Sequence, residues 1–189
     1  MSFSDNFKEF HEIQLNNELR LRQHVPEKDA KAFFEIYQDI EAFQYFGGYS
    51  YPGDTYTEAF TKVLQSRLKS FKAKRDYSWV VDYVGEAIGQ IQLYDFQDNN
   101  TICTIGYFLS RDYWNQGINT RCIKAVSEFA IRSMKIERIE AYANVENTAS
   151  NRSLEKAGYT YEGCLRNKSY INKQFHDVNL WSFIKEDLQ

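Results

Sequence analysis

The sequence predicts an α/β (α+β) fold built on a mixed, mostly antiparallel sheet. Short segments in which apolar and polar residues alternate, separated by polar turns, are typical of antiparallel strands. One helical segment instead joins two strand-like segments, 102–109 and 138–145, and such a connection makes its strands parallel neighbours. The 189 residues contain only two prolines and show no low-complexity tract or fixed repeat. We therefore expect a single domain over residues 1–189.

The chain begins with a predicted hairpin followed by a helix. Residues 18–25 read ELRLRQHV, in which apolar and polar residues alternate as they do in a strand. The preceding segment, FHEIQLNN, is suited to pair with this strand, with its two asparagines at the turn. Residues 26–40 are expected to be helical, because Pro26 stands near the start and acidic residues fill the first turn.

A loop rich in glycine and tyrosine, over 44–55, precedes a second predicted helix. Thr55 and Glu58 have the spacing of a capping box at the start of this helix. The helix is expected to run to about Lys74.

Three strands are predicted to form the centre of the sheet, at 79–84, 87–96 and 102–109. A Gly-Glu turn joins the first two strands, and the polar segment QDNN joins the second to the third. After the third strand comes a polar segment, RDYWNQGINTRC, and then an apolar helix-like run at 123–135.

The last third of the chain is expected to hold a strand, a short helix and a closing antiparallel pair. In the strand RIEAYANV, the alternation places every second residue up to Val145 on one face. Asn147 or Thr148 is suited to cap the helix that follows, and Gly158 supplies its left-handed end. These last elements are the helix at 146–159 and strands near 161–167 and 177–184.

The composition limits the classes of partner. Hydrophobic residues make up 43% of the chain, and the formal net charge is -3. A nucleic-acid-binding domain usually has a basic face and a high pI, whereas this sequence has a pI near 5.7, so we expect no direct nucleic-acid partner. No apolar run approaches the length of a membrane span and the N-terminus lacks the pattern of a secretory signal, so we expect a cytoplasmic protein without a membrane partner.

The cysteines and histidines do not suggest a disulfide framework or a metal site. The three cysteines are odd in number and far apart, and the histidines do not stand at metal-ligand spacing from them. We expect no metal, and we expect reduced, mostly buried thiols. The residues concerned are Cys103, Cys122, Cys164, His11, His24 and His176.

The polar segment 111–122 has the chemistry of an anion site. It offers consecutive backbone N–H groups from Gln116 to Thr120, at the point where a helix is expected to begin. The first N–H groups of a helix lack intrahelical partners, and its dipole is positive there. Gly117 allows the main chain to approach an anion closely, and Arg111 and Arg121 flank the turn. By itself this pattern also suits an ordinary strand-to-helix turn, because the GxGxxG and GxxxxGK[ST] fingerprints are absent.

Several stretches, in order and at matching spacing, together resemble the GNAT superfamily of N-acetyltransferases. The closer resemblance is to the branch that contains the Rim-type acetylators of ribosomal-protein N-termini. The matching stretches are IGYFLSRDYWNQGINT (105–120), NVENTASNRSLEKAGY (144–159), YEGCLRN (161–167) and HDVNLWSFIKEDL (176–188), with ELRLRQHVPEKDAKAFFEIYQD matching the branch's opening strand and helix. The resemblance implies a GNAT-like fold whose central parallel strands splay apart, with helices on both faces of the sheet.

The resemblance further implies acetyl-CoA as the co-substrate. Its pyrophosphate would rest on the backbone N–H groups of the turn, and its pantetheine would pair with main-chain groups of the first parallel strand. The implied cofactor-binding residues are Tyr107, Phe108, Leu109, Gln116, Gly117, Ile118, Asn119, Thr120, Asn147 and Ser150. Asn147 would hydrogen-bond the pantetheine arm, although a role as a helix cap alone is the alternative. The chain departs from the strict family pattern around Gly117, with Trp114 and Asn119 where Gln or Arg and Gly or Ala are usual.

The reaction implied by the resemblance is direct attack of a primary amine on the acetyl thioester, through a tetrahedral intermediate. The backbone N–H of Phe108 is the candidate to hold the oxyanion, and the hydroxyl of Ser150 is the candidate to donate to the leaving thiolate. Many members of the family carry an acid where this chain has Thr104. No general base is therefore assigned, and the groups that stay open are Asp95, Glu41, His176 and Asp177.

Several readings of function stay open at the level of the sequence. The acceptor amine is a peptide N-terminus or a small molecule, bound beside the tyrosine-rich loop. One alternative is a non-catalytic acyl-CoA-binding module or sensor on the same fold. A binding protein for RNA or the ribosome is another, against which the low pI counts. The sequence is compatible with a monomer or a homodimer.

Overall fold

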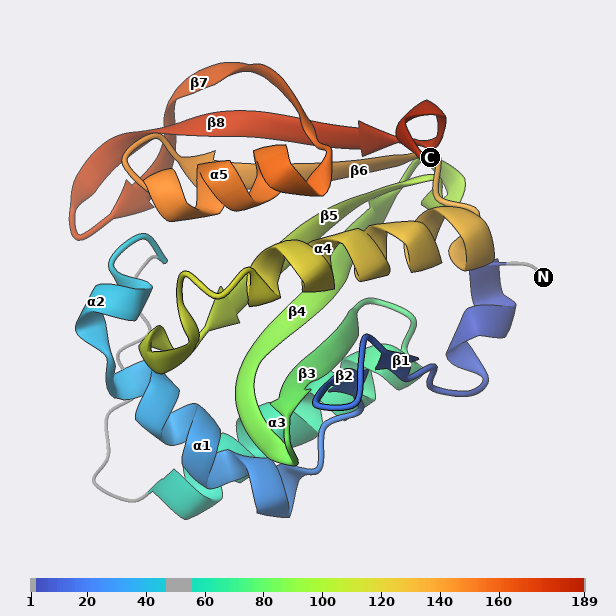
Figure 1. The fold of residues 1–189 in the computed structure, drawn as a ribbon, viewed down its shortest axis with the longest axis vertical. Coiled ribbons are helices and arrows are strands. Elements are labelled where there is room, and N and C mark those ends of the chain that lie inside the picture. The colour runs from blue at the N-terminus through green and yellow to red at the C-terminus, as the bar shows by residue number, and fades with distance from the viewer. Residues whose placement is uncertain (1–2, 47–55, 189) are drawn as a thin grey trace.

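One mixed sheet forms the centre of the computed structural model, and helices pack on both of its faces (Figure 1). The structure describes residues 3–46 and 56–188. The strands are β1 (Ile13–Gln14), β2 (Leu19–Arg22), β3 (Tyr77–Tyr83), β4 (Glu86–Gln97), β5 (Ile102–Leu109), β6 (Arg138–Asn144), β7 (Thr160–Ile171) and β8 (Gln174–Ile184). The α-helices are α1 (Pro26–Gln38), α2 (Ile40–Phe43), α3 (Tyr56–Lys72), α4 (Ile118–Phe129) and α5 (Thr148–Ala157).

The eight strands are ordered β1-β2-β3-β4-β5-β6-β8-β7. Neighbouring strands are antiparallel throughout this order, except that β5 and β6 are parallel. Helix α4 makes the connection between β5 and β6, as the helical segment between them predicted. The predicted mixed, mostly antiparallel α/β fold is confirmed.

The predicted N-terminal hairpin is present, but its strands are short. The side chain of Asn16 forms the turn, since its Oδ1 accepts hydrogen bonds from the N–H groups of Glu18 and Leu19 at 2.9 and 2.8 Å. Strand β2 ends at Arg22 rather than at residue 25. Sequence periodicity did not identify a 3₁₀ turn at Phe3–Phe7 or the single-turn helix α2, because neither is long enough to show a period.

The remaining elements differ from the prediction mainly at their ends. Val145 was expected to share the face of the buried β6 residues, but β6 ends one residue earlier and Val145 is 44% exposed. After Phe129 the helical path continues as a π-helical turn at Ala130–Met134. Strands β7 and β8 are longer than predicted, because they continue to a tight turn beyond Ile171. The capping box expected at Thr55 lies outside the described residues.

Two apolar clusters fill the space on opposite faces of the sheet. Trp79 and Val81 of β3 belong to the cluster under α4 and α5, whereas Val80 between them belongs to the cluster under α1 and α3. Successive side chains of a strand point to opposite faces, so these helices cover the two faces of the sheet (Figure 1). Aromatic residues make up half of the cluster under α1 and α3, whereas aliphatic residues predominate in the cluster under α4 and α5.

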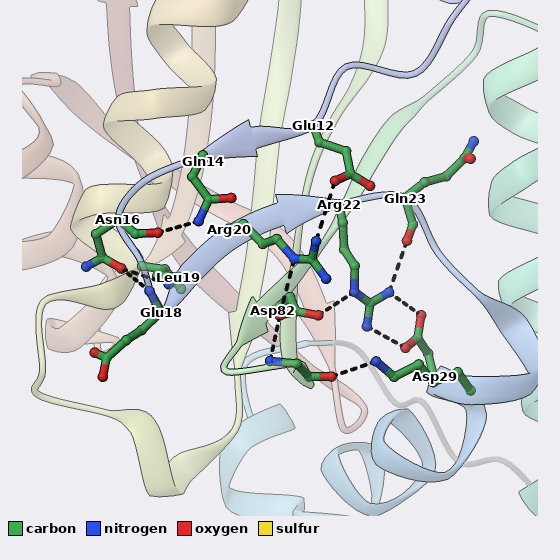
Figure 2. A network of polar contacts seen from close by, with 12 residues as sticks. Glu12, Gln14, Asn16, Glu18, Leu19, Arg20, Arg22, Gln23, Asp29 and Asp82 are labelled. Carbon is green, nitrogen blue, oxygen red and sulfur yellow. Dashed lines mark hydrogen bonds and ion pairs between the residues drawn. The ribbon is translucent and has the colours of Figure 1, made fainter.

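A buried ion-pair network fixes α1 against the sheet (Figure 2). The guanidinium of Arg22 donates to both carboxylate oxygens of Asp29 at 2.8 and 2.7 Å, and to Asp82 of β3 at 2.5 Å. All three side chains are buried. Burial opposes ionisation of Asp82, but Arg22 outweighs burial and lowers the pKa of this carboxyl group. The network therefore joins the first turn of α1 to β2 and β3, and α1 leads directly to the site described next.

Among the described residues, no helix is both long and apolar enough to cross a lipid bilayer. Cys103 and Cys122 are buried free thiols, and burial raises the pKa of the Cys122 thiol to about 12. Cys164 on β7 is exposed, which differs from the expectation for buried thiols at this one position.

Candidate active site

The parallel strands β5 and β6 are paired at one end and separated at the other. Their register runs only from Ile102 opposite Arg138 to Thr104 opposite Glu140. Beyond this point β5 stays paired with β4 as far as Leu109, and β6 stays paired with β8 as far as Asn144. Each strand thus follows its antiparallel neighbour, and the pair splays apart, as the family resemblance implied. We call the gap between Ile105–Leu109 and Ala141–Asn144 the strand opening.

The backbone groups of β5 that face the strand opening follow from the β4–β5 register. The N–H of Ser110 donates to the carbonyl of Ile88 in β4 at 2.8 Å. Backbone groups alternate in direction along an antiparallel strand, so those of Phe108 also point to β4. Those of Tyr107 and Leu109 point the other way, into the strand opening. Gly89 makes the close approach of β4 feasible here, because a Cβ atom at this position would lie 2.4 Å from the carbonyl oxygen of Phe108.

This geometry corrects the role expected for Phe108. Its backbone N–H points to β4, and its side chain packs in the apolar cluster under α1 and α3. It therefore does not offer an oxyanion donor or a main-chain partner to a ligand in the strand opening. The N–H groups of Tyr107 and Leu109 are the candidates instead. The pairing register decides that the N–H of Phe108 points to β4 and those of Tyr107 and Leu109 do not, and this register cannot be read from the sequence.

The turn after β5 leads to an uncapped helix N-terminus. Gly117 is the N-cap of α4 with φ 71°, and no side chain caps the helix. The structure shows no protein acceptor, among the described residues, for the N–H groups of Ile118, Asn119 and Thr120. Glycine adopts the left-handed backbone conformation at this position without strain. A Cβ atom at Gly117 would meet nothing within 4 Å, so open space lies beside it.

The side chains around this turn are arranged differently from the expectation. Arg111 does not face the turn, because its guanidinium binds both carboxylate oxygens of Asp39 at 2.7 and 2.8 Å and also contacts Glu41. This ion pair holds the corner between α1 and α2 beside the end of β5. Trp114, which replaces the usual Gln or Arg, donates from its indole N–H to the carbonyl of Leu109 at 2.9 Å. Trp114 thus fixes the turn against the strand, while Arg121 is exposed on α4.

The N-terminus of α5 carries the second group of predicted residues. Asn147 is its N-cap, and the side-chain oxygen accepts from the N–H of Ser150 at 3.0 Å. The capping role of Asn147 is thus present, and its side-chain N–H groups have no partner among the described residues. The hydroxyl of Ser150 lies 2.9 Å from the hydroxyl of Tyr107, which reaches it from β5. Tyr107 and Ser150 are therefore brought together across the edge of the strand opening.

Asn151 is a structural residue of this site that the sequence analysis did not single out. Its Nδ2 donates to the carbonyls of Asn144 and Asn147 at 2.9 and 2.8 Å. Its Oδ1 accepts from Asn179 and from the indole N–H of Trp181, both at 2.9 Å. Asn151 therefore joins the first turn of α5 to β6 and β8. Its place one residue after Ser150 in the matching stretch NTASN was the available signal.

Glu140 is the second residue that sequence reasoning missed. It stands beside Thr104 in the parallel register, at the point where the strand opening begins. Its side chain is 22% exposed and accepts hydrogen bonds from Arg138 at 2.9 Å and from the hydroxyl of Tyr142 at 2.6 Å. Side chains at one register level of a sheet share a face, so this carboxylate lies on the same face as Thr104.

The four groups that the sequence left open as a general base are spread over the molecule. Asp95 is exposed near the end of β4, where the register with β5 shifts, and with φ 54° it accepts from Gln97 at 2.6 Å. Glu41 contacts Arg111. His176 stands opposite Ser169 in the β7–β8 hairpin, and Asp177 accepts from the N–H of Asn167 at 2.8 Å.

Comparison with known proteins identifies the family. A family model described as an acetyltransferase (GNAT) domain matches residues 18–160. The uncharacterized N-acetyltransferase YoaA of Bacillus subtilis (strain 168) is 28% identical over 169 residues, covering 88% of this chain and 93% of that protein. The ribosomal-protein-serine acetyltransferase of Escherichia coli (strain K12) is 30% identical over 99 residues, which are 52% of this chain and 55% of that protein.

A solved structure supports the same assignment at the level of the fold. The structure of RimL, a ribosomal L7/L12 alpha-N-protein acetyltransferase in complex with coenzyme A, superposes with a TM-score of 0.83. It is 24% identical in sequence and covers 95% of this chain and 100% of that chain. The splayed strands and the uncapped α4 agree with the family match over residues 18–160. The chain therefore belongs to the GNAT family of acetyltransferases, and its relatives support a place in the Rim-type branch.

Proposed function

We propose that this acetyltransferase transfers an acetyl group from acetyl-CoA to the nitrogen of a primary amine. One observation carries the proposal. The edge of β5 at Tyr107 and Leu109 pairs with no strand on the side of the strand opening, and the turn after it leads to the uncapped N-terminus of α4 at Gly117. A pantetheine chain needs main-chain hydrogen-bond partners, and the pyrophosphate attached to it needs anion-binding N–H groups. The chain offers both in the order in which they occur along CoA.

The residues present fit this co-substrate. The N–H groups of Ile118, Asn119 and Thr120 are free to bind a pyrophosphate, and open space lies in front of Gly117. Gln116 precedes them, with its side chain bound to the carbonyl of Asp112 at 3.1 Å, so its backbone N–H is the group we assign to the phosphates. Asn147 keeps its side-chain N–H groups for the pantetheine, even though its oxygen caps α5. Phe108 is not among these residues, because its backbone N–H points to β4.

When bound, acetyl-CoA supplies an activated acetyl thioester that a neutral amine can attack. The N–H groups of Tyr107 and Leu109 lie about 6.6 Å apart along β5, so one of them would donate to the acetyl oxygen as it gains negative charge and the other would be left for the pantetheine. The hydroxyl of Ser150 would donate to the sulfur. An ammonium ion has no lone pair, so a group of the protein must first accept its proton. We assign this role to Glu140, whose carboxylate stands at the start of the strand opening.

The acceptor is proposed to be the N-terminus of a peptide or a small amine. The corner between α1 and α2, held by Arg111, borders the end of β5, and Tyr45 just after α2 donates to the carbonyl of Glu146 at 3.4 Å. The strand opening therefore has protein on both sides, as a groove for a chain end would need. A related protein carries the name ribosomal-protein-serine acetyltransferase, which favours a peptide N-terminus over a small amine.

The test is calorimetric titration of the purified protein with acetyl-CoA, comparing the wild type with Gly117→Asp and Gly117→Asn. Asn and Asp both tolerate the left-handed backbone at this position, so the two variants share the same backbone strain and nearly the same size. Only aspartate adds a negative charge beside the pyrophosphate. We expect Gly117→Asp to lower the affinity at least about tenfold and Gly117→Asn to lower it much less.

Acetyl transfer is then measured with a panel of peptides with free N-termini and of small amines. Transfer to any of these would support the enzyme, and binding without transfer to any of them would favour the acyl-CoA sensor. Equal affinity of the two Gly117 variants would argue against a pyrophosphate at this turn. Absence of binding up to millimolar acetyl-CoA would overturn the proposed function.

A further inference from the structure

The hydroxyl pair formed by Tyr107 and Ser150 is a built feature of the strand opening. Their oxygens lie 2.9 Å apart, although the residues come from β5 and α5 and are 43 positions apart in the sequence. The Tyr107 oxygen also lies 3.4 Å from the carbonyl oxygen of Ser150. The Tyr107 hydroxyl has a single hydrogen and can donate fully to only one of these oxygens, and the 2.9 Å contact with the Ser150 hydroxyl is the shorter and stronger of the two. A phenol is the more acidic of the two hydroxyl groups, which makes it the better donor.

The Ser150 hydroxyl is used differently from those of two other helical serines, and in the same way as that of Ser127, which also pairs with a tyrosine. Ser66 in α3 and Ser153 in α5 each donate to a backbone carbonyl of their own helix, at 2.6 and 2.9 Å. Such local bonds are the usual way in which a helical serine uses its hydroxyl hydrogen. Ser150 makes no such bond among the described residues, and Tyr107 occupies one lone pair of its oxygen. The hydroxyl hydrogen of Ser150 is therefore left for a ligand.

We infer that Tyr107 is a positioning residue, which donates to Ser150 and thereby directs the Ser150 hydroxyl hydrogen toward the sulfur of CoA. This inference rests on the proposed function, because it needs CoA in the strand opening. Tyr107 then has two separate roles, since its backbone N–H also faces the opening. A hydroxyl that accepts one hydrogen bond becomes a stronger donor in the next, so the pair stabilises the thiolate more than Ser150 would alone.

Burial keeps Tyr107 in its donor form at physiological pH. Loss of solvation raises the pKa of its hydroxyl well above the ordinary value, although the contact with Ser150 acts in the opposite direction. The raised pKa favours the protonated, hydrogen-bond-donating form of the phenol.

The chain contains a matched control for this pair. Ser127 of α4 and Tyr159 after α5 also share a hydroxyl–hydroxyl hydrogen bond, at 2.8 Å. Both residues are buried in the apolar cluster under α4 and α5, and Tyr159 is 4% exposed. The variant Tyr159→Phe thus removes the same chemical group from the same kind of pair. That pair shares no hydrogen bond with Tyr107 or Ser150 among the described residues, although the Tyr159 hydroxyl is near enough to Tyr107 to interact with it electrostatically.

The experiment measures the pKa of the CoA thiol in its complex with the protein, from the ultraviolet absorbance of the thiolate as the pH is raised. The variants are Tyr107→Phe, Ser150→Ala, the double variant and Tyr159→Phe, and calorimetry with CoA checks that each one binds. This readout needs neither turnover nor an acceptor. We expect a thiol pKa below that of free CoA in the wild type, a rise of about one unit in Ser150→Ala and a smaller rise in Tyr107→Phe.

The double variant tests the order of the pair. If Tyr107 acts through Ser150, the double variant should match Ser150→Ala, and Tyr159→Phe should match the wild type. The inference fails if Tyr107→Phe keeps the wild-type thiol pKa, if its shift persists in the Ser150→Ala background, or if Tyr159→Phe shifts the thiol pKa equally. Binding of CoA with an unshifted thiol pKa would also sink the inference but leave the CoA site intact. No binding of CoA to the wild type would instead overturn the proposed function.

Discussion

Two residues at the strand opening, Thr104 and Glu140, bear on the acidic residue that many members of the family carry on the first parallel strand. Thr104 occupies that position and has no ionisable group, whereas Glu140 stands beside it on β6 in the parallel register. A carboxylate on the neighbouring strand, on the same face of the sheet, can reach the same part of the strand opening. Arg138 and Tyr142 hold its two oxygens, so its position is fixed by neighbours on its own strand.

This arrangement predicts a catalytic defect for Glu140→Gln. The amide cannot accept a proton from the amine, so we expect kcat to fall by about 10²–10³-fold, with little change in the affinity for acetyl-CoA. Steady-state kinetics with an acceptor found in the panel would measure the first quantity, and calorimetry the second. The control is Glu137→Gln, at an exposed neighbouring position where the carboxylate pairs with Lys185. Activity of Glu140→Gln within about twofold of the wild type would show that another group accepts the proton.

At the scale of elements, the site depends on how α5 is held against the sheet. Ser150 and Asn147 lie in or just before the first turn of α5, which Asn151 binds to β6 and β8 through four hydrogen bonds. These bonds therefore join the N-terminus of α5 to the end of β6. The α1–α2 corner is held in a comparable way, by the ion pair between Asp39 and Arg111.

We expect Asn151→Ala to lower the free energy of unfolding by about 2–3 kcal/mol, since four partners lose a hydrogen bond in a half-buried place. The affinity for CoA should fall as well, because the cap at Asn147 loses its support. Asn151→Asp is the matched variant, as it keeps the acceptor for Asn179 and Trp181 but loses both donors. A carboxylate oxygen would then face the carbonyls of Asn144 and Asn147, so urea unfolding should show Asn151→Asp destabilised at least as much as Asn151→Ala. Unchanged stability in Asn151→Ala would contradict the role of Asn151 in holding α5 against the sheet.

At the scale of the whole molecule, carboxylates with lowered pKa values join distant parts of the chain. Asp82 belongs to the buried network under α1, and Asp39 holds the α1–α2 corner. Glu162 binds Arg138 at 2.7 and 2.6 Å and accepts from Ser182 at 2.6 Å, which joins β6, β7 and β8. The hydrogen bonds from Arg138 and then Ser182 lower the pKa of Glu162 to about 2. These groups bind protons more readily in the unfolded chain than in the native state.

The fold is therefore expected to lose stability in acid. A carboxyl group with a depressed native pKa stabilises the fold above its unfolded pKa, and this contribution is lost as the pH falls toward the native value. For Glu162 that window extends from its ordinary pKa of 4.5 down to about 2. Thermal unfolding of the wild type and Glu162→Gln should differ at pH 7, and the difference should shrink through this window. A difference in melting temperature that stays constant from pH 7 to pH 3 would contradict this account.

Much of the architecture was predictable because its signals are local. Alternation in RIEAYANV, the proline at the start of α1 and the glycine before α4 each act within a few residues, so the order of strands and helices follows from them. The single parallel pair followed as well, because one helix joins its strands. The exposure of Val145 and the one-turn helix α2 were not predicted, because strand ends and very short helices depend on tertiary contacts.

The sequence by itself determined the family pattern, the turn at Gly117 and the cap at Asn147, because each lies within one short segment. Only the tertiary structure decided which groups meet. Strand register turned the backbone of Phe108 toward β4 and those of Tyr107 and Leu109 toward the strand opening. Folding also joined Arg111 to Asp39, 72 residues away in the sequence. Pairing across such distances is set by packing of the whole sheet, and no local pattern encodes it.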